Sequence, residues 1–144
     1  MSDRDLSAAV ERLYASLVRR SRRDAPELEP PLTPTQRLAL TLAADLGPLR
    51  LGALAQRLGT SDSAATRAVD ALAATGFAER IQDPDDGRAV LVGATASGRA
   101  RVVAIRDRLE RALEPAAMAL DPSDRERLVE LLERLSGGLD ADER

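Results

Sequence analysis

The stretch LAQRLGTSDSAATRAVDALAATGFAERIQDPDDGR, residues 54–88, decides the fold of this chain. Apolar residues recur at helical spacing on both sides of a Gly-Thr-Ser break, which predicts two short helices around a tight turn. We expect Gly59 to adopt the left-handed conformation that ends the first helix. We expect the Ser61 side chain to cap the second helix by accepting a hydrogen bond from a backbone N–H. This half of the stretch therefore predicts a helix-turn-helix.

The second half of the stretch predicts a small β-sheet. Gly76 is placed to end the second helix, and the alternation over residues 77–81 is typical of a strand. Residues 83–87 are rich in Asp, Pro and Gly and predict a turn, after which apolar residues 89–92 return as a second strand. Residues 49–51 can add a short third strand beside this hairpin. The fold class expected is mainly α with a small β-wing, a winged helix-turn-helix.

The second helix of the pair is expected to be half buried and to present a polar face. Its apolar positions are Ala65, Ala68, Val69, Leu72 and Ala73, and its polar positions are Asp62, Ser63, Thr66, Arg67 and Asp70. Small residues near its start would let the helix approach the floor of a DNA groove closely. Arg67 has two interpretations: it contacts a base or phosphate, or it forms a surface ion pair with Asp70 or Asp86.

The hairpin tip carries a second set of charged residues. Arg88 is expected to contact the minor groove or a phosphate, because a side chain at a tip adds nothing to the core. Asp83 and Asp86 are expected to shape the turn and to hold Arg80 or Arg88. The residues predicted to contact DNA are Ser61, Ser63, Ala64, Thr66, Arg67 and Arg88.

A series of short motifs runs from the second helix through the hairpin into the following helix. The motifs are TRAVDAL at 66–72, Gly76, Arg80, DPDDGR at 83–88 and TASG at 95–98. Their joint order resembles the MarR family of bacterial transcription regulators. The resemblance implies one MarR-like domain over residues 1–144, with the winged helix-turn-helix at 33–100. It also implies sequence-specific binding to double-stranded DNA as a homodimer, with the function of a repressor.

One position departs from the family pattern, because Gly87 stands where the family usually has the first Arg of the wing. Only Arg88 then remains at the tip to enter the minor groove. The chain is also acidic, with a net charge of −3 and a pI near 5.1. Both observations favour an alternative, a winged-helix protein-interaction module without DNA binding. Residues 47–101, however, carry seven Arg against six acids.

The chain ends are predicted to form helices with apolar stripes. A helix from residue 5 carries Leu6, Val10, Leu13, Tyr14, Leu17 and Val18; a helix capped by Thr95 carries Val102, Ile105, Leu109, Ala112, Leu113 and Ala116; a last helix carries Leu128, Leu131, Leu132 and Leu135. Pro115 is expected to kink or end the middle helix, and Gly137 and Gly138 to stop the last one. A second copy would bury these stripes. The alternative is packing within one chain.

We therefore expect residues 5–24 and 101–138 to be dimerisation helices. A two-fold dimer implies a palindromic operator with half-sites about 10 base pairs apart. The resemblance further implies a small amphipathic or aromatic ligand between these helices and the DNA-binding region. Tyr14 is the candidate contact, because it is an aromatic residue with a polar handle; its position beside Val10 and Val18 favours a place in the core instead.

Composition limits the remaining functions. The chain has neither Cys nor His, which excludes disulfides and thiol chemistry and argues against a structural zinc site. It has no Gly-rich phosphate loop and no nucleophile elbow, so we expect no catalytic residues, no metal and no cofactor. No apolar run is long enough to span a membrane, and Asp3 and Asp5 interrupt any signal-peptide pattern. We therefore expect a cytoplasmic protein.

Overall fold

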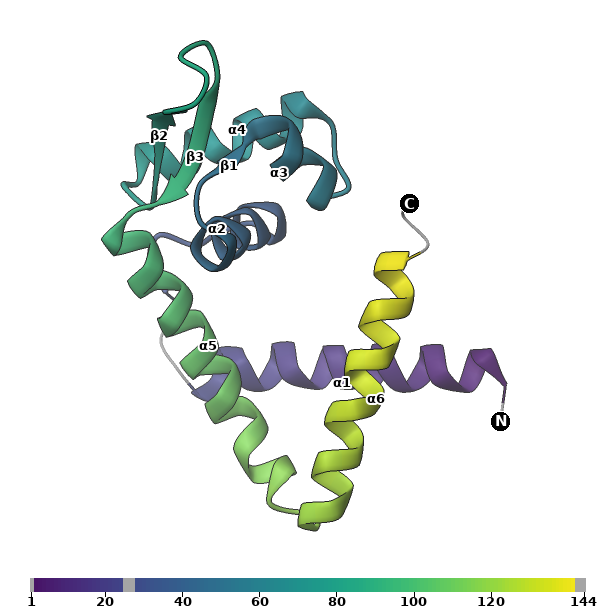
Figure 1. Ribbon diagram of the computed structural model, residues 1–144. Helices are drawn as coiled ribbons and strands as arrows, with labels where there is room; N and C mark the ends of the chain where they lie inside the picture. The colour runs from purple at the N-terminus through teal and green to yellow at the C-terminus, as the bar shows by residue number, and fades with distance from the viewer. Residues whose placement is uncertain (1, 25–27, 142–144) are drawn as a thin grey trace. The chain divides into compact units, whose positions relative to one another are not determined.

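The computed structural model describes residues 2–24 and 28–141, which form six helices and three strands there (Figure 1). The helices are α1 (Asp3–Asp24), α2 (Pro34–Leu46), α3 (Leu51–Arg57), α4 (Asp62–Ala74), α5 (Ala96–Ala117) and α6 (Pro122–Ala141); the strands are β1 (Leu49–Arg50), β2 (Ala78–Gln82) and β3 (Val90–Ala94). The chain divides into a central unit, Ala25–Arg108, and a terminal unit, Met1–Asp24 with Leu109–Arg144. The expected fold class, mainly α with a small β-wing, is confirmed.

The sheet of the central unit is antiparallel with strand order β1-β3-β2. Ala78 of β2 faces Ala94 of β3, and Leu49 of β1 faces Val92 of β3. The short third strand predicted beside the hairpin is thus present. β2 and β3 begin one residue later than predicted. We call the hairpin of β2, β3 and the loop 83–89 between them the wing.

Local signals set the helix ends of the central unit. The Thr33 side chain accepts a hydrogen bond from the Gln36 backbone N–H at 3.2 Å, and the Gln36 side chain accepts one from the Thr33 N–H at 3.0 Å. Gly59 and Gly76 have φ values of 60° and 78° and end α3 and α4 as predicted. The predicted cap of α4 is also present, since Ser61 Oγ accepts from the Ala64 N–H.

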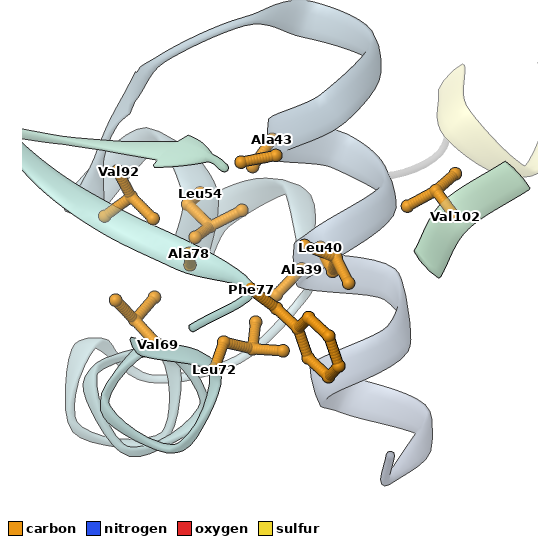
Figure 2. Packing of buried hydrophobic residues seen from close by; sticks show 11 residues of the cluster. Ala39, Leu40, Ala43, Leu54, Val69, Leu72, Phe77, Ala78, Val92 and Val102 are labelled. Atoms are coloured by element: carbon orange, nitrogen blue, oxygen red, sulfur yellow. The ribbon is translucent and has the colours of Figure 1, made fainter. Parts of the chain in front are cut away.

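The core of the central unit lies between the helices and the sheet. Figure 2 shows side chains from α2, α3, α4, β3 and α5 pointing toward one another. Leu40, Leu54 and Leu72 come from three different helices and are almost fully buried. Each such side chain contributes about 1.5–3 kcal/mol relative to leaving it exposed. α4 packs against this core with its apolar face, so its opposite face is exposed to solvent.

Burial differs from expectation at the edge of α4. Ala73 was expected on its apolar face but is exposed. The helix ends at Ala74, so Ala73 lies in its last turn, where Leu72 already fills the core position.

The Thr-Ala-Ser-Gly motif joins α5 to the wing. Thr95 Oγ1 donates to the Gly76 carbonyl at 2.6 Å and accepts from the Gly98 N–H at 3.0 Å, so one side chain links the end of α4 to the start of α5. A Cβ at Gly98 would lie 1.9 Å from the carbonyl oxygen of Phe77. Glycine is therefore required where α5 crosses the start of the wing.

A buried arginine, Arg101 of α5, binds the segment before α2, residues 28–33, which we call the connector. The Arg101 guanidinium is about 8% exposed and donates to the carbonyl oxygens of Leu28 and Glu29 at 2.7 Å each, and to that of Pro30. Its carbon Cζ lies 5.0 Å from the Phe77 ring centroid. Burial lowers the pKa of Arg101 from its usual value, but guanidinium groups stay charged in proteins. No feature of the sequence had indicated this role.

The terminal unit contains helices whose apolar stripes are exposed in the single chain. Leu6, Leu13 and Leu131 are about half exposed, at 51%, 49% and 45%. α1 and α6 cross (Figure 1). A hollow of about 340 Å³ lies between the two helices and is lined by Leu6, Val10, Leu135 and other residues. The chain alone therefore does not bury these stripes.

One predicted helix end in the terminal unit is wrong. Gly137 and Gly138 lie inside α6, which continues to Ala141. A glycine ends a helix when it takes positive φ; in a helical conformation it costs only about 1 kcal/mol relative to Ala. Pro115, expected to kink or end its helix, lies inside α5, which ends two residues later at Ala117. Among the described helices, none has the length and apolarity needed to cross a membrane.

Candidate nucleic-acid interface

The exposed face of α4 presents short polar side chains beside one cation. Ser63 and Arg67 are exposed, whereas Ala64 and Thr66 are half-buried. The Thr66 hydroxyl donates to the Asp62 carbonyl at 2.7 Å. Ser61 is occupied as the cap of α4. Of the predicted contact residues on α4, Ser63 and Arg67 are therefore the two with exposed side chains and no hydrogen bond within the described residues.

The ion-pair interpretation of Arg67 does not hold. Asp70, one of its two expected partners, instead accepts from Arg80 of β2 at 2.5 Å. The other, Asp86, lies 3.7 Å from Arg50. Arg67 has no ion-pair partner in the part of the chain that the structure describes. Its charge is therefore available to an external anion.

A shallow hollow lies between α4 and the start of α2. It has a volume of about 200 Å³ and is lined by Thr33, Thr35, Gln36, Ala64, Arg67 and Ala68. None of Thr33, Thr35 and Gln36 was among the residues predicted to contact DNA. Their nearness to Arg67 depends on how α2 packs against α4, which no local pattern reveals.

Asp83 makes several hydrogen bonds at the foot of the wing, where the loop 83–89 meets the strands. Its Oδ2 accepts from Arg50 Nη2 at 2.8 Å and from Arg50 Nε at 3.2 Å, and its Oδ1 accepts from the Asp85 N–H at 2.9 Å. The pKa of the Asp83 carboxyl is lowered, mainly by the hydrogen bond from the Asp85 N–H and next by the one from Arg50. The hydrogen bond to Asp83 and the charge of its carboxylate raise the pKa of Arg50 in turn. Asp83 shapes the turn, as predicted. The expected partners Arg80 and Arg88 were wrong, because the cation it holds is Arg50.

The tip of the wing is closed by further hydrogen bonds. Asp86 Oδ1 accepts from the Arg88 N–H at 3.1 Å, and the Asp86 carbonyl accepts from the Ala89 N–H at 2.9 Å. Gln82 Nε2 donates to the Gly87 carbonyl at 2.9 Å. The Arg88 side chain itself is exposed. An ordered loop thus presents one cation to solvent.

The Tyr14 side chain of α1 is 67% exposed. Its interpretation as a core residue is therefore wrong for the single chain. The hollow between α1 and α6 is lined by other residues of the same helix, including Leu6 and Val10. Among the described residues, no group of three or more carboxylates is arranged to hold a metal ion.

Known proteins share both the sequence pattern and the fold. Residues 32–90 match the model of the MarR family. An HTH-type transcriptional regulator of Mycobacterium tuberculosis (strain CDC 1551 / Oshkosh) is 36% identical over 122 residues, which cover 85% of this chain and 81% of the relative. The chain belongs to the MarR family. It is therefore a DNA-binding transcription regulator.

Solved structures share the fold of this chain. The crystal structure of RV1404 from Mycobacterium tuberculosis has the same fold, with a TM-score of 0.79 at 24% identity; the match covers 96% of this chain and 95% of that one. The BpsR protein of Bordetella bronchiseptica matches with a TM-score of 0.67 at 25% identity, over 92% of this chain and 98% of that one.

Proposed function

We propose that this MarR-family regulator is a repressor that binds a palindromic operator as a homodimer. The observation that carries the proposal is the exposed Arg67 on α4, which has no ion-pair partner among the described residues, together with the ordered wing that presents Arg88. A winged-helix module that binds only proteins has no need for a cation at the wing tip. A protein bound across a promoter excludes polymerase from it. The DNA lies in the cytoplasm, where we place this activity, and no catalytic step is part of it.

The residues of α4 and the wing divide into three roles in this proposal. Ser63 and Arg67 contact base edges in the major groove, where hydroxyl and guanidinium groups donate to base acceptors. Ala64 and Thr66 are small enough to allow the close approach, and Ser61 holds the start of the helix at the groove. Arg88 enters the minor groove or binds a phosphate.

The second copy is proposed from the exposed apolar stripes of the terminal unit. α1 and α6 each leave large apolar side chains about half exposed. Contiguous apolar surface of this kind marks an interaction site. A two-fold dimer would cover the same surface on both copies and present two α4 helices to successive major grooves, about 10 base pairs apart.

A small ligand is the proposed signal. BpsR is described as a protein whose DNA binding is regulated by 6-hydroxynicotinic acid. We propose that a small amphipathic or aromatic compound also regulates DNA binding by the present protein. Tyr14 is the proposed contact, because its exposed phenol offers a ring for stacking and a hydroxyl for hydrogen bonding.

A salt series tests the proposal against the alternative of a protein-interaction module. Binding to an operator fragment, recovered by pulling down genomic DNA with the protein, is measured by fluorescence anisotropy at several salt concentrations. A DNA-binding protein loses affinity with a log-log slope of about −0.9 for each phosphate it neutralises. Specific binding with a slope of several units is expected. Failure to enrich or bind any DNA fragment would favour the protein-interaction module.

A further inference from the structure

Arg50 connects the helix-turn-helix to the foot of the wing. It lies in β1, where it faces Leu91 of β3, and it directly precedes α3. Its guanidinium makes two hydrogen bonds to one carboxylate oxygen of Asp83 and lies 3.7 Å from a carboxylate oxygen of Asp86. One side chain thus contacts both acids that shape the wing loop. The partners are separated by 33 residues in the sequence.

The two acids carry this contact into the loop. Asp83 is almost fully buried, and each of its carboxylate oxygens accepts at least one hydrogen bond. Its backbone N–H also donates to the Ala89 carbonyl at 3.0 Å, which closes the loop at its foot. The second carboxylate oxygen of Asp86 accepts from the Arg88 N–H. A continuous set of contacts therefore runs from Arg50 to the backbone of Arg88.

We propose that Arg50 is a positioning residue for DNA binding, which acts through Asp83 and Asp86 to hold the wing loop in its DNA-binding conformation before DNA arrives. The inference rests on the proposed contact between Arg88 and DNA. A loop that is ordered in advance loses less conformational entropy on binding, so more of the contact energy remains as affinity. This matters here because Gly87 leaves the tip with a single arginine.

Arg50 has a competing role that the test must separate. Its side chain is 56% exposed, so it could itself bind a phosphate. A positioning residue acts only through Arg88, whereas a phosphate contact acts independently of it. The two roles therefore differ in whether the effects of changing Arg50 and Arg88 add.

The experiment is a double-mutant cycle on operator affinity. Arg50→Gln, Arg88→Ala and the double variant are compared with the parent protein by fluorescence anisotropy on one operator duplex. We expect Arg50→Gln to weaken binding severalfold in the parent and to have no further effect in the Arg88→Ala background, where the salt slope also stays unchanged. Arg57→Gln is the matched control, because Arg57 is an exposed arginine of α3 outside the contact set; whatever its effect, it should add to that of Arg88→Ala.

A second measurement reports the order of the wing without DNA. Hydrogen exchange of the Arg88 and Ala89 amides should be faster in Arg50→Gln and Asp83→Asn than in the parent and unchanged in Arg57→Gln. Arg50→Lys, which keeps the charge but offers only one terminal donor group, should restore part of the protection. The Val92 amide of the core strand should stay protected in each variant, which shows that the fold is intact.

The outcomes separate this inference from the proposed function. If Arg88→Ala binds DNA as tightly as the parent, the wing contact fails and the positioning role fails with it. If Arg88→Ala weakens binding but the Arg50→Gln loss adds to it and lowers the salt slope further, the wing contact stands and Arg50 is a phosphate contact. Unchanged exchange of the Arg88 and Ala89 amides in Arg50→Gln would also overturn the inference.

Discussion

The guanidinium of Arg101 lies over the ring of Phe77, 5.0 Å from its centroid, and joins α5 to the start of the wing strand β2. The same group donates to three consecutive backbone carbonyls of the connector before α2. Backbone carbonyl groups outside helices and strands need other hydrogen-bond partners, and the flat guanidinium supplies several donors in one plane. Arg101 therefore holds three separate segments of the central unit together.

Replacing Arg101 by Met should destabilise the protein by about 2–4 kcal/mol, because it removes a buried guanidinium and the hydrogen bonds that it donates to the carbonyls of residues 28–30. Urea unfolding followed by circular dichroism measures the change. Arg101→Lys keeps the charge but lacks the planar set of donors, so it should lie between Met and the parent. A Met variant as stable as the parent would mean that water replaces the guanidinium without cost.

Gly98→Ala should be among the most destabilising single-methyl changes in the chain. The added Cβ would lie 1.9 Å from the Phe77 carbonyl oxygen, so α5 or the wing must shift. Gly52→Ala in α3 is the matched control, because nothing lies within 4 Å of its Cβ; it should stabilise by about 0.5–1 kcal/mol. Thermal unfolding of both variants checks the prediction. Equal melting temperatures for the two would contradict the close approach.

Arg88→Ala should lower operator affinity with little change in melting temperature, because the side chain is exposed and adds nothing to the core. Gly87→Arg should tighten binding and steepen the salt slope by about one unit. The site accepts a side chain, since the nearest atom to the new Cβ is Gln82 Nε2 at 3.6 Å. Anisotropy titrations across a salt series measure both effects. No gain from Gly87→Arg would place residue 87 away from the DNA backbone.

Arg67→Ala and Ser63→Ala should erode discrimination between the operator and random DNA by about 1–3 kcal/mol for each lost base contact. The reason is that both side chains are exposed on α4 and free of intramolecular partners among the described residues. Competition titrations with random duplexes give the ratio of affinities. Equal weakening on both kinds of DNA would make these residues phosphate contacts instead.

Deleting residues 121–144 should leave a chain that is monomeric, aggregated or unfolded. The deletion removes α6 and its half-exposed apolar positions Leu128, Leu131 and Leu132, which we propose to lie in the dimer interface. Sedimentation velocity of the parent and the truncated protein measures the oligomeric state. A well-behaved truncated dimer would exclude α6 as a main interface.

Local chemistry determined much of this fold in advance. The caps at Thr33 and Ser61, the left-handed glycines Gly59 and Gly76, and the hairpin that follows Gly76 were all predictable, because each signal acts over only a few residues of chain. The motif at residues 66–72, in its order with the wing, likewise indicated the family. These features depend on hydrogen bonds and backbone conformations that neighbouring residues decide among themselves.

The tertiary structure decided which distant groups meet. Asp83 had two nearby arginines, Arg80 and Arg88, as expected partners, but strand pairing brought it to Arg50 from 33 residues away. Helical spacing placed Ala73 inside α4's apolar face, but the end of the helix left it exposed. The burial of Arg101 followed from the contact of residues 28–30 with α5. Side-chain partners and burial depend on how whole elements pack, and periodicity within one element carries no information about that packing.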